Sequence, residues 1–238
     1  MRIGIEVGGT FTDLIAIDEG RIKVAKVPSV PKCPDEGVYA ALAAAGLAVD
    51  QVTELVHGST VATNAVIERR GAKVAMIFTN GFRDLLLMQR QDRLRSYDLA
   101  YAKPKPIVPR RHCFEVAERV LADGTIAEAL DESAVASELV PRLRAGGFGA
   151  VAVCLLNAYR NPIHEQRLIA LLRTHLPDAA LVASSEISRE FREYERASTT
   201  AIAAHVQPVI DAYVGRMERW LGERQFHGRL ALMQSNGG

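Results

Sequence analysis

Residues 4–13 read GIEVGGTFTD, and this stretch decides the fold class. Apolar side chains alternate with other residues from Ile3 to Val7, which is the two-residue period of a β-strand. Two glycines follow, and a second apolar run begins at Leu14. Because glycine tolerates the backbone angles of tight turns, the pattern predicts a hairpin with Gly8-Gly9-Thr10 in its turn.

The next segments predict how this hairpin extends into a sheet. Residues 21–27 form a third strand pattern after Gly20, so the first three strands can make an antiparallel meander. Three consecutive strands followed by helix–strand units favour a mixed sheet of the ribonuclease H type over the strict alternation of a Rossmann domain. The further elements predicted here are helices over 35–45 and 60–70 and strands over 52–57 and 73–78.

The remaining chain predicts a second α/β segment and C-terminal helices. Residues 80–110 carry several prolines and a basic cluster, so we expect a long loop there. Pro141 is expected to strain a helix over 132–145, and Pro208 is expected to interrupt the helical pattern of 189–224 and open a second helix. The other predicted elements are a hairpin around Asp123-Gly124, strands over 150–156, 180–183 and 229–233, and a helix from Asn161-Pro162 to His175.

Composition places the chain among soluble globular proteins. Its 238 residues are 48% hydrophobic and 24% charged, with a net charge of +1, which argues against nucleic acid or an anionic membrane as a partner. The first residues leave no room for a secretion signal, and no apolar run is long enough to span a membrane, so we expect a cytoplasmic protein. The three cysteines lie far apart without a CxxC pair, so neither a zinc site nor a disulfide framework is indicated.

The glycine turn and its neighbours predict a phosphate and metal site. Backbone N–H groups of such a turn form an anion nest, and threonine hydroxyls add donors for phosphate oxygens. Carboxylates beside them supply the oxygen ligands that Mg²⁺ prefers. The alternative is a plain hairpin with a surface acid and two strand-favouring threonines. The predicted phosphate ligands are Gly8, Gly9, Thr10 and Thr12, and the predicted catalytic and metal residues are Glu6 and Asp13.

Four separated stretches together resemble the hydantoinase A / 5-oxoprolinase family, and they occur in the family's order. They are GIEVGGTFTD at 4–13, HGSTVATNAVIERRGAKVAMIFTNGFRDLL at 57–86, REYERASTTAIAAHVQPVI at 192–210 and LMQSNGG at 232–238. The family includes ATP-dependent N-methylhydantoinase subunits and nucleotide-binding subunits of acetone-type carboxylases. The resemblance covers the chain from about residue 2 to its last residue.

The resemblance implies an actin-like, Hsp70-like ATPase fold and a reaction that uses ATP and Mg²⁺. An unreactive oxygen of the substrate is phosphorylated, and in the hydrolases this is the carbonyl oxygen of a cyclic amide such as a hydantoin, N-methylhydantoin or 5-oxoproline. The carboxylase branch implies a ketone substrate instead. The resemblance also implies a partner subunit of the hydantoinase B type, and it leaves a homo-oligomer open.

Two further segments are candidate substrate sites. Residues 57–64 end a strand and begin a helix, where free N–H groups favour an anion or a polarised carbonyl, and the resemblance makes them a substrate or phosphate loop. In the alternative, Ser59 is a helix N-cap and His57 is structural. Arg90 and Gln91 can bind a carbonyl or carboxylate, or belong to a solvated basic loop with Arg93 and Arg95. The predicted substrate residues are His57, Ser59, Thr60, Asn64, Arg90 and Gln91.

The sequence departs from the family pattern in one residue and in length. Glu6 stands where the family usually has aspartate, and the extra methylene moves the carboxylate by about 1.5 Å. Family members run to several hundred residues, so we expect an N-terminal portion that holds about half of an ATP site. We expect an N-terminal domain over 1–185, and a helical segment with a strand over 186–238 that leads into a further C-terminal ATPase domain.

Three alternative functions remain open from the sequence. The first is the nucleotide-binding subunit of an acetone-type carboxylase, which shares these motifs. The second is a sugar kinase with a GGT-type phosphate loop. The third is a non-catalytic module that binds nucleotide or assembles partner subunits.

Overall fold

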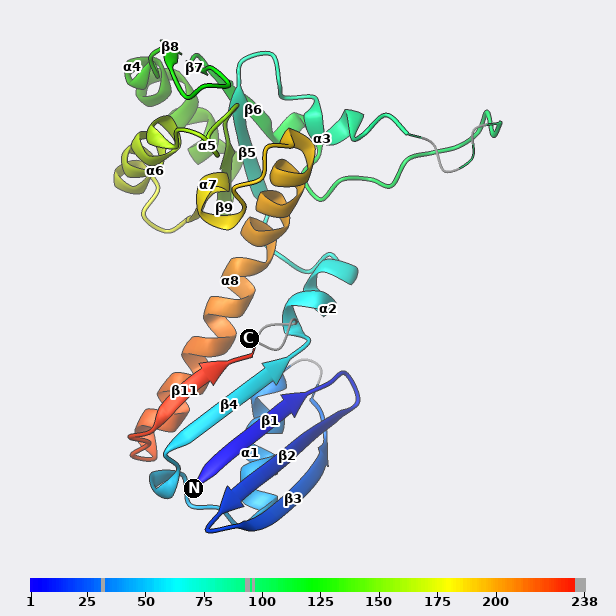
Figure 1. Cartoon of the computed structure of the whole chain (residues 1–238), viewed down its shortest axis with the longest axis vertical. Helices are drawn as coiled ribbons and strands as arrows, with labels where there is room; N and C mark the ends of the chain where they lie inside the picture. The colour runs from blue at the N-terminus through cyan, green and yellow to red at the C-terminus, as the bar shows by residue number, and fades with distance from the viewer. Residues whose placement is uncertain (31–32, 93–94, 96, 234–238) are drawn as a thin grey trace. The chain divides into compact units, whose positions relative to one another are not determined.

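The computed structural model describes residues 1–30, 33–92, 95 and 97–233 of the chain (Figure 1). Arg93 of the predicted basic loop and residues 234–238 of the fourth family stretch lie outside the described residues. The chain forms two compact units. Unit 1 comprises Met1–Glu68 and Val209–Gly238, and unit 2 comprises Arg69–Pro208. Unit 2 is therefore inserted into the sequence of unit 1. The expected division near residue 185, between an N-terminal domain and a helical segment, stays a prediction.

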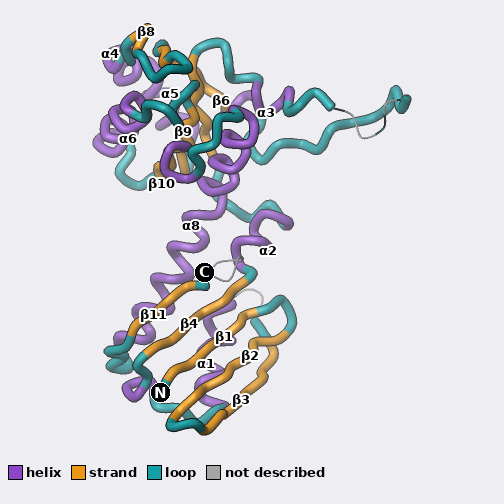
Figure 2. Tube along the Cα trace, in the orientation of Figure 1, coloured by secondary structure: helices purple, strands orange, loops and turns teal. Residues whose placement is uncertain are grey.

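Unit 1 contains a five-stranded mixed sheet. The strands β1 (Arg2–Val7), β2 (Phe11–Asp18) and β3 (Arg21–Pro28) form an antiparallel meander. On the other side of β1, β4 (Glu54–Ser59) and β11 (Arg229–Leu232) continue the sheet in parallel. Figure 2 shows β3 at one edge and β11 at the other, in the order β11-β4-β1-β2-β3. This topology confirms the mixed sheet of the ribonuclease H type.

One face of this sheet forms the core of unit 1. Helix α1 (Pro34–Ala44) and the C-terminal part of α8 (Glu193–Glu223) contribute to the apolar cluster on this face, together with the alternate residues of β1 and β2. Because side chains alternate along a strand, the remaining residues of β1 and β2 point to the opposite face. Two short helical elements border the strands of the unit, namely η1 (Val49–Gln51) and α2 (Val61–Ile67).

Unit 2 contains a four-stranded parallel sheet in the order β10-β9-β5-β6. All residues of the strand over 150–154 are buried, as predicted for a strand that is covered on both faces. The strands are β5 (Val74–Thr79), β6 (Cys113–Val116), β9 (Ala150–Cys154) and β10 (Ala180–Ala183), and a small hairpin pairs β7 (Arg119–Val120) with β8 (Ile126–Glu128). The helical elements of unit 2 outside α8 are α3 (Leu85–Met88), η2 (Arg110–His112), α4 (Glu132–Ala134), η3 (Val135–Leu139), α5 (Val140–Gly146), α6 (Ile163–His175) and α7 (Ser184–Ile187).

The two helical prolines behave differently from one another. Directly before Pro141 the helix widens into a π-helical turn over Val135–Leu139, which is the irregularity expected there. The predicted interruption at Pro208 is wrong, because α8 continues through it for 31 residues. Ala197, Ala201 and Ala204 pack into a core cluster of unit 2, while Met217 and Leu221 pack into the core of unit 1. This packing outweighs the roughly 3 kcal/mol that a proline costs inside a helix.

No helix within the described ranges is both long and apolar enough to cross a membrane.

A buried carboxylate organises the carboxyl ends of β9 and β10. Glu165 is 0% exposed, and its Oε1 accepts hydrogen bonds from the Leu155 N–H at 2.9 Å and the Ser184 hydroxyl at 2.6 Å. Its Oε2 accepts the Ser185 N–H at 2.9 Å. Arg196, also 0% exposed, donates from Nη2 to the Leu155 carbonyl at 2.8 Å. Glu165 therefore satisfies three donors that would otherwise be buried without a partner.

We expect Glu165→Ala to destabilise the protein by at least about 3 kcal/mol, because three buried donors lose their acceptor. Urea unfolding followed by circular dichroism measures the loss. Glu138→Ala removes an exposed acid from the same unit and should change the free energy of unfolding by less than about 0.5 kcal/mol. Equal effects of the two substitutions would contradict the role of Glu165.

Candidate functional site

The two predicted loops of unit 1 meet at the carboxyl ends of the parallel strands β1 and β4. We call this end of the sheet the carboxyl edge. Val7 at the end of β1 lies in register with Ser59 at the end of β4. The Thr60 N–H and the Thr60 hydroxyl both donate to the Val7 carbonyl, at 3.3 Å and 3.4 Å. Ligands of open α/β sheets bind beyond the carboxyl ends of the parallel strands, and this is such an edge.

The glycine turn presents its backbone on this edge. The Gly8 N–H donates to the Phe11 carbonyl at 3.0 Å, which closes the turn. Gly9 and Thr10 are exposed, and a Cβ atom placed on Gly9 would meet nothing within 4 Å. The outer surface of the turn is therefore accessible to a ligand that approaches the backbone closely.

Thr12 lies on the opposite face of the sheet from the turn's acidic neighbours. Its side chain is fully buried, and its hydroxyl shares a hydrogen bond with the Ser29 hydroxyl at 2.9 Å. Gly37 in α1 leaves room for it, because a Cβ atom there would overlap the Thr12 hydroxyl. The structure thus places Thr12 beneath the turn as a support, and direct contact with phosphate stays a prediction.

Glu6 and Asp13 lie directly opposite one another on β1 and β2, and both are exposed. Like charges in such a pair repel each other. Lys26 on β3 offsets part of this repulsion through an ion pair with Asp13 at 2.8 Å. Within the described residues Glu6 forms no ion pair. Its carboxylate reaches across to β4 and lies over Gly58, where a Cβ atom would overlap it.

His57 points into the core of unit 1. It is 1% exposed, and its Nε2 shares a hydrogen bond of 2.5 Å with the hydroxyl of Tyr213 on α8. Burial lowers the pKa of His57 to about 4, and burial raises the pKa of Tyr213 to about 12. Both groups are therefore neutral near pH 7, and their bond joins β4 to α8. This is the structural role that the sequence leaves open for His57.

The residues after His57 shape the beginning of α2. The Val61 N–H donates to the Ser59 hydroxyl at 3.2 Å, and the Asn64 side-chain amide donates to the Thr60 hydroxyl at 3.3 Å. Asn64 is exposed, whereas Ser59 and Thr60 are partly buried. Ser59 therefore stabilises the start of α2. It is also the last residue of β4, at the same end of the sheet as the glycine turn.

Arg90 and Gln91 belong to unit 2, whereas the other predicted site residues belong to unit 1. Arg90 forms an ion pair of 2.5 Å with Glu195 in the first turn of α8. Gln91 is exposed and has a φ of 58°, in the left-handed region. Substrate binding by these two residues stays a prediction.

A model of the hydantoinase/oxoprolinase N-terminal region matches residues 2–176 of the sequence. The chain belongs to the hydantoinase/oxoprolinase family. This match confirms the family resemblance, and the first two of the four stretches lie within it.

Relatives of this family member include enzymes with named substrates. Caprolactamase subunit alpha of Pseudomonas jessenii is 34% identical over 249 residues, which cover 100% of this chain and 36% of the relative. The 5-oxoprolinase of Saccharomyces cerevisiae is 29% identical over 283 residues, which cover 100% of this chain and 22% of the relative.

Solved structures confirm the fold over the whole chain. A nucleotide-free acetone carboxylase structure superposes with a TM-score of 0.87 and 25% identity, covering 100% of this chain and 36% of that one. The ATP-dependent caprolactamase from Pseudomonas jessenii superposes with a TM-score of 0.84 and 32% identity, with the same coverage. This hydantoinase/oxoprolinase sequence spans about a third of the length of these structures.

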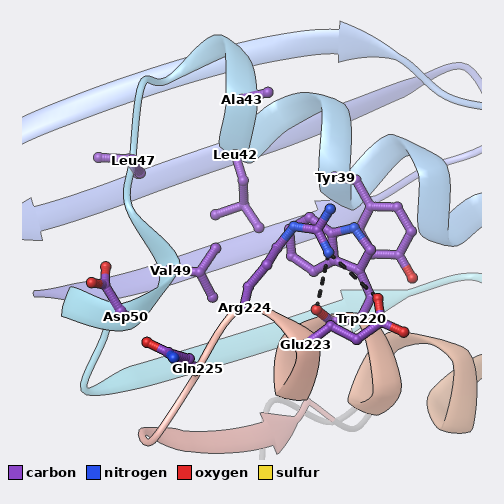
Figure 3. Close-up of a pocket in the computed structure, with 10 residues that line it drawn as sticks. All are labelled: Tyr39, Leu42, Ala43, Leu47, Val49, Asp50, Trp220, Glu223, Arg224 and Gln225. Carbon is purple, nitrogen blue, oxygen red and sulfur yellow. Dashed lines mark hydrogen bonds and ion pairs between the residues drawn. The ribbon is translucent and has the colours of Figure 1, made fainter.

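A hollow of about 430 Å³ elsewhere in unit 1 lies between the C-terminal turns of α1 and α8 (Figure 3). Trp220 stacks on Tyr39 with ring centroids 4.2 Å apart, and the Arg224 guanidinium lies 4.1 Å from the centre of the Trp220 ring. Val49, which lines the hollow, precedes β4, so the hollow lies toward the amino end of that strand. It contains none of the predicted site residues and is distinct from the glycine turn.

Sequence reasoning missed the contacts that join distant segments of the hydantoinase/oxoprolinase fold. Tyr213 lies 156 residues from His57, and no motif or spacing signals their pairing. Gly58 stands inside a motif, but its value as space for Glu6 depends on the register of β1 against β4. The pairing of Lys26 with Asp13 could have been predicted from the sequence, because a regular hairpin register places the two residues opposite one another.

The buried His57 predicts a pH dependence of stability. An unfolded histidine binds a proton near pH 6.5, whereas folded His57 binds one only near pH 4. The unfolded state therefore holds more protons between these values, and stability falls as the pH falls from about 6.5 to about 4, by on the order of 3 kcal/mol. We expect His57→Gln to lose this component in urea unfolding measured at pH 7 and pH 4.

The exposed His227 supplies the matched control. His227→Gln should retain the wild-type dependence, since the substitution leaves the buried His57 in place. An equally steep loss of stability in His57→Gln and the wild type would contradict the assignment.

Proposed function

We propose that this chain provides the nucleotide-phosphate part of an ATP-dependent hydrolase of cyclic amides. The carrying observation is the pairing of β1 with β4, which puts the glycine turn, Glu6 and the Ser59-Thr60 turn at one sheet edge. Family membership and the ATP-dependent caprolactamase relative support this proposal. The 5-oxoprolinase relatives support a lactam-type substrate.

The residues of the glycine turn fit a phosphate group. Gly9 and Thr10 are exposed, and the space around the Cβ position of Gly9 is open, so a phosphate can approach the backbone N–H groups of this turn. Thr12 holds the turn from beneath through Ser29. We assign phosphate binding to the backbone of Gly9 and Thr10, with Gly8 closing the turn and Thr12 in support.

The acidic pair fits a hydrated Mg²⁺ ion. Glu6 and Asp13 stand opposite one another on neighbouring strands, and Mg²⁺ commonly binds one or two carboxylates, directly or through its water, while it keeps water and phosphate oxygens as its other ligands. In the described part of the chain, no group of three His, Cys, Asp or Glu side chains could hold a metal ion. Bound Mg·ATP would supply the phosphoryl group that activates a carbonyl oxygen of the substrate. Glu6 and Asp13 would orient the metal, and Asp13 would share its charge with Lys26.

Gly58 explains how the longer acid at position 6 is accommodated. The Glu6 carboxylate lies over Gly58, so its extra methylene is directed toward β4 and away from the Asp13 side chain. The glycine provides the space for this. We infer that Glu6 and Gly58 act together to place the carboxylate.

The remaining parts of the site are assigned to other residues and chains. His57 supports the end of β4 from the core, and we propose substrate contact for Ser59, Thr60 and Asn64. For Arg90 and Gln91, which belong to unit 2, we propose substrate contact separately. The relatives are longer and include proteins named as subunits, such as caprolactamase subunit alpha and the acetophenone carboxylase gamma subunit. We therefore propose that a second ATPase domain and a partner subunit of the hydantoinase B type complete the enzyme in the cytoplasm.

A second candidate function is the nucleotide-binding subunit of an acetone-type carboxylase. The observation that favours it is the TM-score of 0.87 with the acetone carboxylase structure. Stimulation of ATP hydrolysis by simple ketones, and not by hydantoins or 5-oxoproline, would favour this candidate in the assembled enzyme. Stimulation by sugars alone would favour the kinase alternative.

We expect the chain to bind Mg·ATP with micromolar affinity in isothermal titration calorimetry, without hydrolysing it. Glu6→Gln should weaken binding about tenfold, because one of the two metal carboxylates is lost. Asp18→Asn removes an exposed acid at the far end of β2 and should leave the affinity unchanged. ATP hydrolysis by the chain alone, or equal binding without Mg²⁺, would contradict the proposed half-site.

The pairing of Glu6 with Gly58 predicts a compensating double substitution. Gly58→Ala should weaken Mg·ATP binding several-fold, because the new methyl group displaces the Glu6 carboxylate. Adding Glu6→Asp should restore binding, since the shorter acid avoids the methyl group. Circular dichroism serves to verify that both variants are folded, and failure of the double variant to recover would contradict the shared role.

A further inference from the structure

A second cavity lies entirely within unit 2 and has a different chemistry. It has a volume of about 480 Å³, and its lining includes Val74 at the start of β5 and His112 just before β6. It is therefore located near the amino ends of these two parallel strands. Its volume falls in the range of small-molecule sites.

The lining of this cavity is strongly basic. Arg110 also lines it and is paired with Asp84. The other cations do not pair with a carboxylate within the described ranges, and no acidic residue lines the cavity there. A cavity lined by one sign of charge focuses the field and attracts the opposite charge. We call these cations the basic rim, and they are Arg69, Lys73, Lys105 and Arg111.

The pKa of His112, which also lines the cavity, reflects this positive charge. The pKa of His112 is lowered by burial and, in addition, by the positive charges of Arg111 and Lys73. Lys73 itself donates to the Gly146 carbonyl at 2.6 Å, a neutral acceptor that leaves its charge uncompensated. The cavity is thus positive, and an anion is its natural occupant.

One buried nitrogen in the lining lacks a hydrogen-bond partner. His205 is 6% exposed, and its Nδ1 bonds to the Ala72 carbonyl at 2.9 Å. Its Nε2 has no partner in the part of the chain that the structure describes. Because a carbonyl only accepts, Nδ1 carries the proton, and Nε2 of the neutral ring is an acceptor. Buried polar atoms in native proteins are nearly always hydrogen-bonded, so Nε2 points to a donor on a ligand.

The position of His205 is held tightly by its surroundings. The Ala72 N–H donates to the His205 carbonyl at 2.8 Å, so the two residues share a second bond. Gly71 lies against the ring, and a Cβ atom at that position would overlap it. The ring is therefore a preorganised part of the cavity wall.

Apolar residues form the rest of the wall. Val74, Leu87 and Ile107 line the cavity. Arg69 donates to the Lys105 and Pro106 carbonyls at 2.5 Å and 3.2 Å, which holds this segment in the wall. The cavity thus combines an apolar body with positive charge and one acceptor.

We propose that unit 2 binds a small organic anion in this cavity. The ligand carries a carboxylate or a phosphate ester on an apolar body, with an O–H or N–H donor next to the charged group. The basic rim binds the charge, and His205 Nε2 accepts the donor. This site is separate from the phosphate site of unit 1 and does not depend on the proposed ATP binding.

Calorimetry on the whole chain at low salt tests the ligand class with four probes. Mandelate offers a carboxylate and a hydroxyl, phenylacetate lacks the hydroxyl, phenyl phosphate replaces the carboxylate, and benzyl alcohol has no charge. We expect mandelate to bind about fivefold more tightly than phenylacetate, as one added hydrogen bond allows. A phosphate-ester ligand would be indicated by tighter binding of phenyl phosphate. Equal binding of benzyl alcohol, or no binding of any anion at millimolar concentration, would overturn the proposal.

Two variants test the residues that carry it. Arg111→Gln should weaken binding of every anion at least about threefold, whereas Arg173→Gln, an exposed cation outside the cavity, should not. His205→Asn keeps a donor for the Ala72 carbonyl but removes Nε2, and it should abolish the advantage of mandelate over phenylacetate. Equal effects of Arg111→Gln and Arg173→Gln, or an unchanged mandelate preference in a folded His205→Asn variant, would refute the assignment. Tighter binding of an acidic peptide than of the small anions would refute the ligand class.

Discussion

The parallel pairing of β1 with β4 is the constraint on which unit 1 depends. Its register puts Val7 opposite Ser59 and Glu6 opposite Gly58. A strand repeats every two residues, so a slip of one position would turn Glu6 into the core and expose Ile5. The apolar cluster that buries Ile3, Ile5 and Val7 prevents this slip. The hydrophobic core thereby sets where the candidate phosphate and metal ligands lie, although none of them belongs to it.

Helix α8 shows how tertiary packing overrides local preference. Its first part belongs to the core of unit 2 and its last part to the core of unit 1, while Pro208 stands between them. The helix continues because both ends are anchored within their own units, and the bond between His57 and Tyr213 ties it to β4. One long helix thus supports the insertion of unit 2 into the sequence of unit 1.

The two proposed sites rely on different physical means. In the site proposed for unit 1, main-chain N–H groups of the glycine turn would recognise a phosphate, and the nearby carboxylates would contact it through a cation. In unit 2 the cavity offers cationic side chains around an apolar wall and one preorganised imidazole. The phosphate and metal residues of the first site lie in one short continuous motif. The second is assembled from segments around residues 69–74, 87, 105–112 and 205.

The sequence by itself determined the meander, the mixed sheet, a buried strand that begins at residue 150, the glycine turn of the first hairpin and the family. Each of these follows from local periods, from short motifs or from the order in which they occur along the chain. Only the tertiary structure decided that Thr12 faces α1, that Gly58 makes room for Glu6, that Tyr213 pairs with His57 and that Glu165 joins β9 to β10. These contacts join residues that strand register and packing bring together. A single stretch of sequence specifies neither the register nor the packing.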